Sequence, residues 1–421
     1  MIRVLEIVNA ALTMCAPRCR QRTENPFARG AGCGNRVDFL PIMRILILSW
    51  NFPPALGGIE VVVDHLFNGL RHRGHEVRLL APLAEAATSP GVERAAKKGI
   101  PAYLRFCLSR GAALCREFEP DVIVCGSIVS APAAWWLSRR HKIPYVVLMH
   151  GSDILYGGRV YQTAVRFLTR RADRLAANSE GTRDLLVAAG CAPERIGIVH
   201  PGVDVAAFDR PPDGPPAIPG LPLEGRRVLV TVGRLIRRKG VMEFVTHVLP
   251  ELVKTHPEVL YLVVGEDAKL SLAHKERLRD QIEAKIRELG LEGHARLLGK
   301  LSGDDLRRTL GCSECFVLPC IEIPGDVEGF GIVFLEAALC GTPSVSTRIG
   351  GIPDAVVDGA TGLLAAPGDH GATLHNVLRI LDEPGLRDRL ARAAARRARD
   401  EFSWAAVTRR YESLLMEAIR R

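Results

Sequence analysis

Short apolar runs alternate with helical patterns along most of this chain. Between the first two runs, apolar residues recur at helical spacing from Ile59 to Leu70, and Gly74 marks the end of that helix. Strand-length apolar runs separated by helices are typical of a parallel sheet with helices on both faces. The predicted strands of the first series cover residues 44–49, 76–81, 121–125, 145–150, 174–178 and 196–199.

A stretch rich in proline and glycine at residues 210–222 interrupts this pattern and is typical of a linker. A second series follows it, and a length of 421 residues suits two domains of about 150 to 200 residues each. We therefore predict an α/β protein with parallel-sheet domains at residues 43–209 and 225–402, joined by a linker at residues 210–224. The predicted strands of the second series cover residues 228–232, 260–264, 295–298, 315–318 and 344–347. Ser302-Gly-Asp-Asp305 predicts the capped start of one helix.

Residues 1–42 lack this periodicity and carry scattered arginines with three cysteines. Met43 stands directly before the first predicted strand. We interpret residues 1–42 as a disordered extension or a mis-called start, because the apolar stretch at residues 2–12 is a poor signal peptide.

Composition and charge narrow the possible partners. The chain has 56 basic and 47 acidic residues, a net charge of +9, which is compatible with an anionic substrate or an anionic lipid surface. No nucleic-acid-binding motif occurs and aromatic residues make up 5% of the chain, so we predict no nucleic-acid partner. No run of about 18 apolar residues predicts a membrane span.

Eleven cysteines without a regular framework indicate a reducing compartment. Cys312 and Cys315 have the spacing of a zinc-ligand pair, with Cys320 nearby. No second Cys pair or His pair completes such a site, and Cys315 begins a predicted buried strand. Core packing is the favoured interpretation, and no metal site is predicted.

The most informative segment is Glu328-Gly-Phe-Gly-Ile-Val-Phe-Leu-Glu336, which follows the predicted strand at residues 315–318. Its glycines let backbone N–H groups approach a ligand, and its apolar run predicts a buried helix. A carboxylate on the loop and another on the helix could both bind hydroxyl groups of one molecule. The alternative is an ordinary strand–loop–helix with solvated acids, which is the expectation for the neighbouring Glu322 and Asp326.

Other polar motifs also follow predicted strands. Gly57-Gly58 follows the first strand, His150-Gly-Ser-Asp153 ends the fourth, and Gly233-Arg234 follows the first strand of the second series. Open parallel sheets bind ligands at the carboxyl ends of their strands. Two sheets that present polar motifs at this edge predict a cleft between the domains. The Gly57-Gly58 pair lacks the Gly-x-Gly-x-x-Gly spacing of a dinucleotide fold, which argues against NAD.

The segment Gly233-Arg-Leu-Ile-Arg-Arg-Lys-Gly240 places Arg234 and Lys239 around a helix start. Two cations beside backbone N–H groups suit a diphosphate, because Arg can form bidentate hydrogen bonds to two oxygens and Lys acts as a point charge. We expect Arg237 and Arg238 of the same segment to be solvated.

Together these motifs resemble the retaining glycosyltransferases of family 4, which have two facing Rossmann-like domains with an interdomain cleft, the GT-B architecture. The resemblance covers about residues 43–421. It implies that the C-terminal helix, residues 403–421, crosses back onto the first domain. Two landmarks depart from the family pattern: His200 stands where Asn is common, and Asp354 stands where Glu is common.

The resemblance also implies roles for individual residues. His150 would contact the donor sugar, although a lone histidine in such a position is usually structural. Arg234 and Lys239 would hold the diphosphate, Glu328 a sugar hydroxyl, and Glu336 the ribose hydroxyls. Asp153 is assigned to the acceptor side, with helix capping as its alternative. The remaining donor-binding positions are Gly57, Gly58, Gly233, Gly329, Phe330, Gly331 and Ile332.

The implied activity is transfer of a mannose- or glucose-type hexose from a nucleotide-diphosphate sugar to a lipid-linked or saccharide acceptor, with retained configuration. Cell-envelope or exopolysaccharide synthesis in the cytoplasm, at the inner face of the membrane, is the implied setting. GDP-mannose is slightly favoured over UDP-sugars.

No Asp-x-Asp triplet occurs, so neither a metal nor a cofactor is predicted, and the protein cations would stabilise the leaving diphosphate. Lys97, Lys98, Arg105 and Arg110 around one helix suggest contact with an anionic membrane, with a simple surface helix as the equal alternative.

Two other functions stay open. One is a sugar-nucleotide epimerase or hydrolase of the same fold, which would need no acceptor. The other is a non-catalytic sugar-nucleotide- or polysaccharide-binding subunit. Arg234, Lys239, Glu328 and Glu336 together argue against the second, because a pure scaffold has no need of all four.

Overall fold

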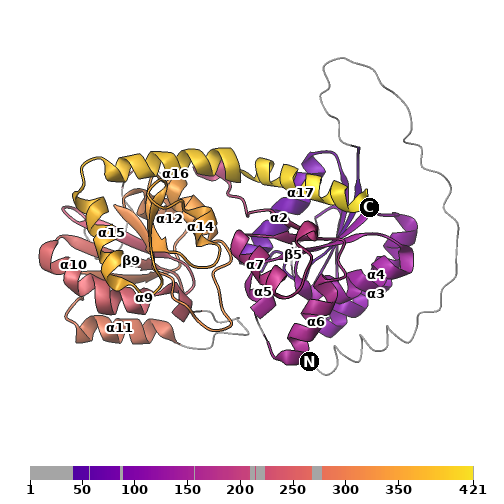
Figure 1. Cartoon of the computed structure of the whole chain (residues 1–421), viewed down its shortest axis with the longest axis horizontal. Coiled ribbons are helices and arrows are strands. Elements are labelled where there is room, and N and C mark those ends of the chain that lie inside the picture. The colour runs from indigo at the N-terminus through magenta and orange to yellow at the C-terminus, as the bar shows by residue number, and fades with distance from the viewer. Residues whose placement is uncertain are drawn as a thin grey trace, which may run out of the picture.

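The computed structural model describes residues 41–55, 57–85, 89–155, 157–208, 214, 223–267 and 277–420. The predictions for residues 1–42 and for the linker at residues 210–224 therefore lie almost entirely outside the described residues. Two sheets with their helices stand side by side (Figure 1), and we call them the first and second domain.

The first domain is built on a seven-stranded parallel sheet of order β3-β2-β1-β4-β5-β6-β7. Helices cover both faces, so the central strands are buried on both sides and consist of unbroken apolar runs. The strands are β1 (Arg44–Leu48), β2 (Glu76–Ala81), β3 (Val92–Arg94), β4 (Val122–Cys125), β5 (Tyr145–Met149), β6 (Arg174–Ala177) and β7 (Ile196–Ile198). The helices are α2 (Gly58–His72), α3 (Ile100–Glu117), α4 (Ala131–His141), α5 (Ser152–Leu155), α6 (Arg159–Thr169) and α7 (Glu180–Ala188), with 3₁₀ turns η1 (Ile128–Ser130) and η2 (Pro193–Arg195). The short helix α8 (Val205–Phe208) follows β7 along the chain but packs on the core of the second domain.

The second domain has a six-stranded parallel sheet of order β10-β9-β8-β11-β12-β13, again between two helix layers. Its strands are β8 (Arg227–Val232), β9 (Val259–Val264), β10 (Ala295–Gly299), β11 (Cys315–Leu318), β12 (Ser344–Thr347) and β13 (Gly362–Ala365). Its helical elements are η3 (Arg237–Lys239), α9 (Val241–Glu243), η4 (Phe244–Val248), α10 (Leu249–Thr255), α11 (Leu278–Glu288), α12 (Gly303–Gly311), α13 (Ile332–Leu339), α14 (Ile352–Ala355), α15 (His370–Asp382) and α16 (Leu386–Phe402).

The predicted α/β class and parallel sheets are confirmed, and every predicted strand agrees with an observed one within one residue at either end. The capped helix start is also confirmed, because the Ser302 side chain accepts from the Asp305 N–H at 3.2 Å. Two edge strands were missed, β3 and β13. The first has three residues with one buried apolar side chain, and the second, Gly-Leu-Leu-Ala, lacks the β-branched residues that mark a strand.

The last helix, α17 (Trp404–Ile419), packs on the first domain although α16 before it packs on the second (Figure 1). Tyr411 and Leu415 are buried in the same core as α2. The buried Glu412 carboxylate binds Arg73 Nη2 at 2.6 Å and His75 Nε2 at 2.7 Å. The domains are thus joined by two consecutive helices, of which α16 packs on the second domain and α17 on the first.

The chain crosses between the domains at two neighbouring places. The N–H of Val203 donates to the carbonyl of Phe402 at 2.8 Å, so the segment after β7 lies beside the junction of α16 and α17. At this junction Trp404 stacks on His65 with ring centroids 4.3 Å apart.

Helix α3 carries the basic stretch that suggested membrane contact. Its apolar side chains Tyr103 and Leu104 are buried in the domain core, and Phe106 packs against that core. Arg110 is bound by Glu93 and Glu117. The apolar face is therefore occupied by the protein itself, as in a simple surface helix. Among the residues that the structure describes, no helix combines the length and apolar character needed to cross a membrane.

Candidate active site

Loops from the two sheets meet between the domains. A methyl group placed on Gly329, after β11, would come within 2.6 Å of the carbonyl oxygen of His150, after β5. The Glu180 N–H donates to Asp354 Oδ2 at 2.5 Å across the same boundary. The carboxyl ends of the two sheets therefore face each other, and the segments that hold His150 and Gly329 meet at this boundary.

The close approach at Gly329 leads to a prediction. A Cβ there would push on backbone atoms of His150, which cannot rotate away as a flexible side chain can. We expect Gly329→Ala to hold the domains apart and to lower sugar transfer by about 10- to 100-fold, because small displacements of reacting groups are costly.

The matched control is Gly158→Ala, since a Cβ on Gly158 meets nothing within 4 Å and its φ of −77° suits any residue. Rates with saturating donor and the melting temperature of each variant are the measurements. A Gly329→Ala protein that melts and transfers sugar like the control would show that this approach is dispensable.

The two predicted diphosphate ligands lie in different environments. Arg234, after β8, is exposed and forms no ion pair within the described part of the chain. Lys239 is only 8% exposed, and its Nζ lies 2.6 Å from Glu328 Oε2. A Cβ on Gly233 would lie 3.6 Å from Lys239 Cε, so the lysine side chain runs beside the glycine that follows β8.

The expectation that Arg238 is solvated was wrong. This side chain is buried and donates to Asp326 at 3.0 and 3.2 Å and to Glu328 Oε2 at 3.3 Å. The expectation for Asp326 was also wrong, because its side chain is only 13% exposed. The cause is the 3₁₀ turn η3, which exposes Arg237 and turns the next two side chains inward. A sequence signal existed: three adjacent basic residues a few positions after one strand, and three acids in the loop after the strand beside it.

Glu328 is buried but charged. Burial alone would raise its pKa, yet the charges of Lys239 and Arg238 and their hydrogen bonds lower the pKa to about 2. The carboxylate is therefore ionised over the whole physiological range. Burial would lower the pKa of Arg238, but the charges of Glu328 and Asp326 and the hydrogen bond to Asp326 raise that pKa above its ordinary value.

Glu336 has the opposite environment. It lies on α13, and burial raises its pKa. No hydrogen-bond or ion-pair partner for its carboxylate is found among the described residues. An unpaired, half-buried carboxylate can accept from two vicinal hydroxyl groups, whereas Glu328 is already held by two cations.

The glycine turn before α13 presents backbone rather than side chains. Phe330 is 2% exposed, and its ring packs on Phe402 and His200 with centroids 5.5 and 5.4 Å apart. Within the described structure, the N–H groups of residues 329–331 donate to no protein acceptor. Ile332 contributes to the cores of both domains and lies 4.0 Å from the Cβ position of Gly58 at the start of α2. Ile332 is thus an interdomain packing residue, and the turn itself has free donors.

His150 and Asp153 lie on the first domain's side. His150 Nε2 is 2.9 Å from the Gly126 carbonyl oxygen, and because that oxygen can only accept, Nε2 carries the proton. Burial raises the pKa of Asp153, opposed by the neighbouring His150. Asp153 lies in the first turn of α5, and its Oδ2 has no hydrogen-bond partner in the described residues.

The two departures from the family pattern contact each other. His200 Nε2 lies 3.4 Å from Asp354 Oδ2, the same oxygen that receives the Glu180 N–H. The sequence placed these residues 154 positions apart, and only the joint occurrence of two departures hinted at a contact.

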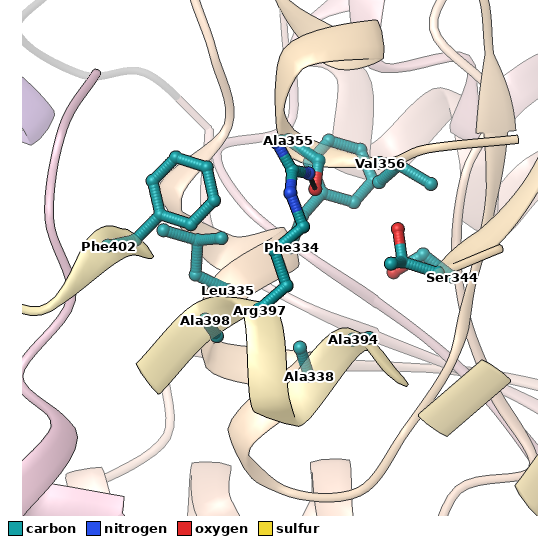
Figure 2. A pocket seen from close by; sticks show the side chains of 11 residues that line it. Phe334, Leu335, Ala338, Ser344, Ala355, Val356, Ala394, Arg397, Ala398 and Phe402 are labelled. Atoms are coloured by element: carbon teal, nitrogen blue, oxygen red, sulfur yellow. Dashed lines mark hydrogen bonds between the residues drawn. The ribbon is translucent and has the colours of Figure 1, made fainter. Parts of the chain in front are cut away.

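A small cavity of about 10 Å³, roughly the space of one water, lies behind α13 (Figure 2). Phe334, Ala338 and Phe402 are among the residues that line it. Arg397 crosses this region and donates to the carbonyls of Asp354 and Ala355 at 2.8 and 3.1 Å. These contacts tie α14 to α16, so the cavity is a small gap in the packing between helices and not a substrate site. Nowhere in the described ranges do three or more His, Cys, Asp or Glu side chains gather as metal ligands.

Comparison with known families identifies both domains. The model described as "Glycosyltransferase Family 4" matches residues 56–207, and the model described as "Glycosyl transferases group 1" matches residues 219–397.

Individual proteins are similar over almost the whole chain. The D-inositol 3-phosphate glycosyltransferase of Streptomyces bingchenggensis is 31% identical over 90% of this chain and 90% of its own. The GDP-mannose-dependent alpha-(1-6)-phosphatidylinositol monomannoside mannosyltransferase of Mycolicibacterium smegmatis is 28% identical over 88% and 98%. The crystal structure of Anabaena HepE, in complex with UDP and glucose, superposes with a TM-score of 0.69 at 20% identity, over 89% of this chain and 99% of that one.

Proposed function

Because this chain belongs to the group 1 glycosyltransferases of family 4 and has the GT-B fold, it transfers a sugar from a nucleotide sugar, and we propose that the sugar is a mannose- or glucose-type hexose. The proposed acceptor is lipid-linked or a saccharide, and the configuration is retained. The observation that carries the proposal is the ion pair of Lys239, after β8, with Glu328, after β11, next to the close approach of Gly329 to the loop that holds His150.

The two cations, Arg234 and Lys239, are proposed to stabilise the leaving diphosphate. Negative charge builds on the β-phosphate as the glycosidic bond breaks, and fixed positive charges stabilise it. Arg234 is exposed and unpaired within the described residues, so its guanidinium is available for bidentate hydrogen bonds to two phosphate oxygens. Lys239 has three donors, and Glu328 occupies one of them.

The two glutamates divide the recognition of hydroxyl groups. Glu336 has a free carboxylate and is assigned to the ribose. Glu328 is ionised and is assigned to a hydroxyl of the transferred sugar. The N–H groups of residues 329–331 and the His150 side chain complete the donor site, with Gly57, Gly58 and Gly233 bordering the phosphates.

The donor is proposed from the relatives. The mycobacterial relative is named as GDP-mannose-dependent, whereas the structurally similar HepE was crystallised with UDP and glucose. GDP-mannose is therefore the first candidate and a UDP-hexose the second.

The acceptor is assigned to the first domain, where Asp153 has an unpaired carboxylate oxygen among the described residues. Membrane contact is proposed as purely electrostatic. Lys97, Lys98 and Arg105 are exposed, whereas the apolar side of α3 is buried. The proposed location is the inner, cytoplasmic face of the cell membrane, whose anionic lipids would attract these basic side chains.

The test is a panel of GDP- and UDP-sugars, assayed for sugar release and transfer with and without EDTA. We expect turnover of one donor, with a rate unchanged by EDTA and lost in Arg234→Ala. Loss of the rate in EDTA would refute the metal-independent mechanism. Absence of both turnover and nucleoside diphosphate binding would favour a non-catalytic subunit instead.

A further inference from the structure

Two anions compete for the ammonium group of Lys239. In this structure its ammonium contacts Glu328 at 2.6 Å, and the proposed function also assigns it to the donor diphosphate. The diphosphate brings about two negative charges next to the buried carboxylate of Glu328 and the partly buried carboxylate of Asp326. Like charges at short range in a buried site repel strongly and drive one of the acids to take up a proton. One ammonium cannot compensate both a diphosphate and Glu328.

We propose that Arg238, anchored by Asp326, is a positioning residue. It keeps Glu328 charged and in place while Lys239 binds the diphosphate. This inference rests on the proposed function, since it takes the diphosphate site as given. It adds Arg238 and Asp326 to the residues that determine turnover, although neither is required to touch the donor.

The geometry gives Arg238 a rigid position. One guanidinium nitrogen donates to both oxygens of Asp326, at 3.0 and 3.2 Å, and another reaches Glu328 Oε2 at 3.3 Å. The Arg238 carbonyl accepts from the Ile321 N–H at 2.9 Å, which joins η3 to the loop after β11. Gly240, in the left-handed conformation with φ of 70°, packs directly against the Pro319 carbonyl and leaves no room for a side chain.

The charges around Glu328 come from few groups. Lys239 and Arg238 reach it from η3, and Asp326 lies in its own loop. The Cys320 thiol after β11 is neutral, because burial raises its pKa to about 12. From the first domain, His150 presents its backbone carbonyl to Gly329 beside this cluster. Once Lys239 is engaged by the diphosphate, Arg238 is the cation that remains for Glu328 among these groups.

The consequence is a change in pH dependence. In the wild type, Glu328 stays ionised and contributes no acid limb between pH 5.5 and 8.5. In Arg238→Met, the buried carboxylate beside a diphosphate has a raised pKa and takes up a proton as the pH falls. The rate at saturating donor should then fall about tenfold per pH unit below that pKa. The affinity for nucleoside diphosphate should change only a few-fold, since Arg234 and Lys239 are intact.

The experiment compares full-length wild type with Arg238→Met, Arg238→Lys and the exposed neighbour Arg237→Met. Turnover of GDP-mannose, or of the UDP-sugar that the donor panel selects, is followed from pH 5.5 to 8.5, and GDP and UDP binding is measured by calorimetry. We expect the acid limb in Arg238→Met, its disappearance in Arg238→Lys, which keeps a charge, and a wild-type profile in Arg237→Met. If Arg238→Met does not fold, Arg238→Gln keeps the bulk and hydrogen bonding and should show the same limb.

A wild-type pH profile and rate in the Met or Gln variant would overturn the inference. The proposed function would survive that outcome, provided that Arg234→Ala and Lys239→Met still lose diphosphate binding. If the wild type itself binds neither GDP nor UDP, the proposed function fails and this inference fails with it. The two failures are therefore distinguishable in one set of measurements.

Discussion

Lys239→Met should lower kcat/KM for sugar transfer by about 100-fold or more, because it removes a buried cation from the place where the leaving phosphate develops charge. Lys239 is 8% exposed, and a charge in such a site is screened little by water or salt. Met has a similar length and fills the space beside Gly233. The variant should also bind nucleoside diphosphate more weakly, since the same ammonium holds the ground state.

The control is Arg237→Met, which removes one positive charge from an exposed neighbouring position. Rates and calorimetric affinities for GDP and UDP are compared at the same ionic strength. The fold should persist in Lys239→Met, because Arg238 still pairs with Glu328 at 3.3 Å. A folded Lys239→Met protein with the rate of the control would mean that the diphosphate binds elsewhere.

Glu328→Gln should abolish at least about 99% of transfer while leaving nucleoside diphosphate binding intact or tighter. The amide keeps the shape of the side chain but removes the charge assigned to the sugar hydroxyl. It also releases Lys239 from its 2.6 Å ion pair, so more positive charge faces a bound diphosphate. Turnover and product affinity should therefore move in opposite directions, which a general loss of structure would not produce.

The matched variant is Glu336→Gln on the neighbouring helix. Glu336 is assigned to the ribose, so this change should weaken GDP or UDP binding by about tenfold, the effect of one lost hydrogen bond to a charged group. Calorimetry with the free nucleotides and rates at saturating donor separate the two cases. Weaker diphosphate binding in Glu328→Gln than in Glu336→Gln would show that the roles of the glutamates are reversed.

Much of the fold could be predicted because local patterns encode it. A strand buried on both faces needs an unbroken apolar run, as in Cys315–Leu318, and a helix on a sheet needs apolar residues at helical spacing, as in α2. The position of the candidate residues followed from topology, since parallel strands bring their carboxyl ends to one edge. The edge strand Val92–Arg94 was not predicted, because three residues are too few to show a period.

Pairings between distant segments could not be predicted in the same way. Arg238 looked like a solvated residue in a run of basic residues, and Asp326 looked like a solvated loop acid. Their ion pair depends on how the 3₁₀ turn after β8 aims side chains at the loop after β11. The contact of His200 with Asp354 likewise depends on how the two domains meet.

By itself, the sequence determined that this protein has two doubly wound parallel sheets and that glycine turns, two cations and two glutamates follow the ends of particular strands. Periodicity and turn chemistry act over a few residues, so they can be read along the chain. Tertiary structure alone decided which charges compensate each other: Glu328 is held by Lys239 and Arg238, whereas Glu336 has no partner among the described residues. Coulomb interactions and burial depend on distances in space, and residues 90 positions apart come within hydrogen-bonding distance only after the sheet has formed.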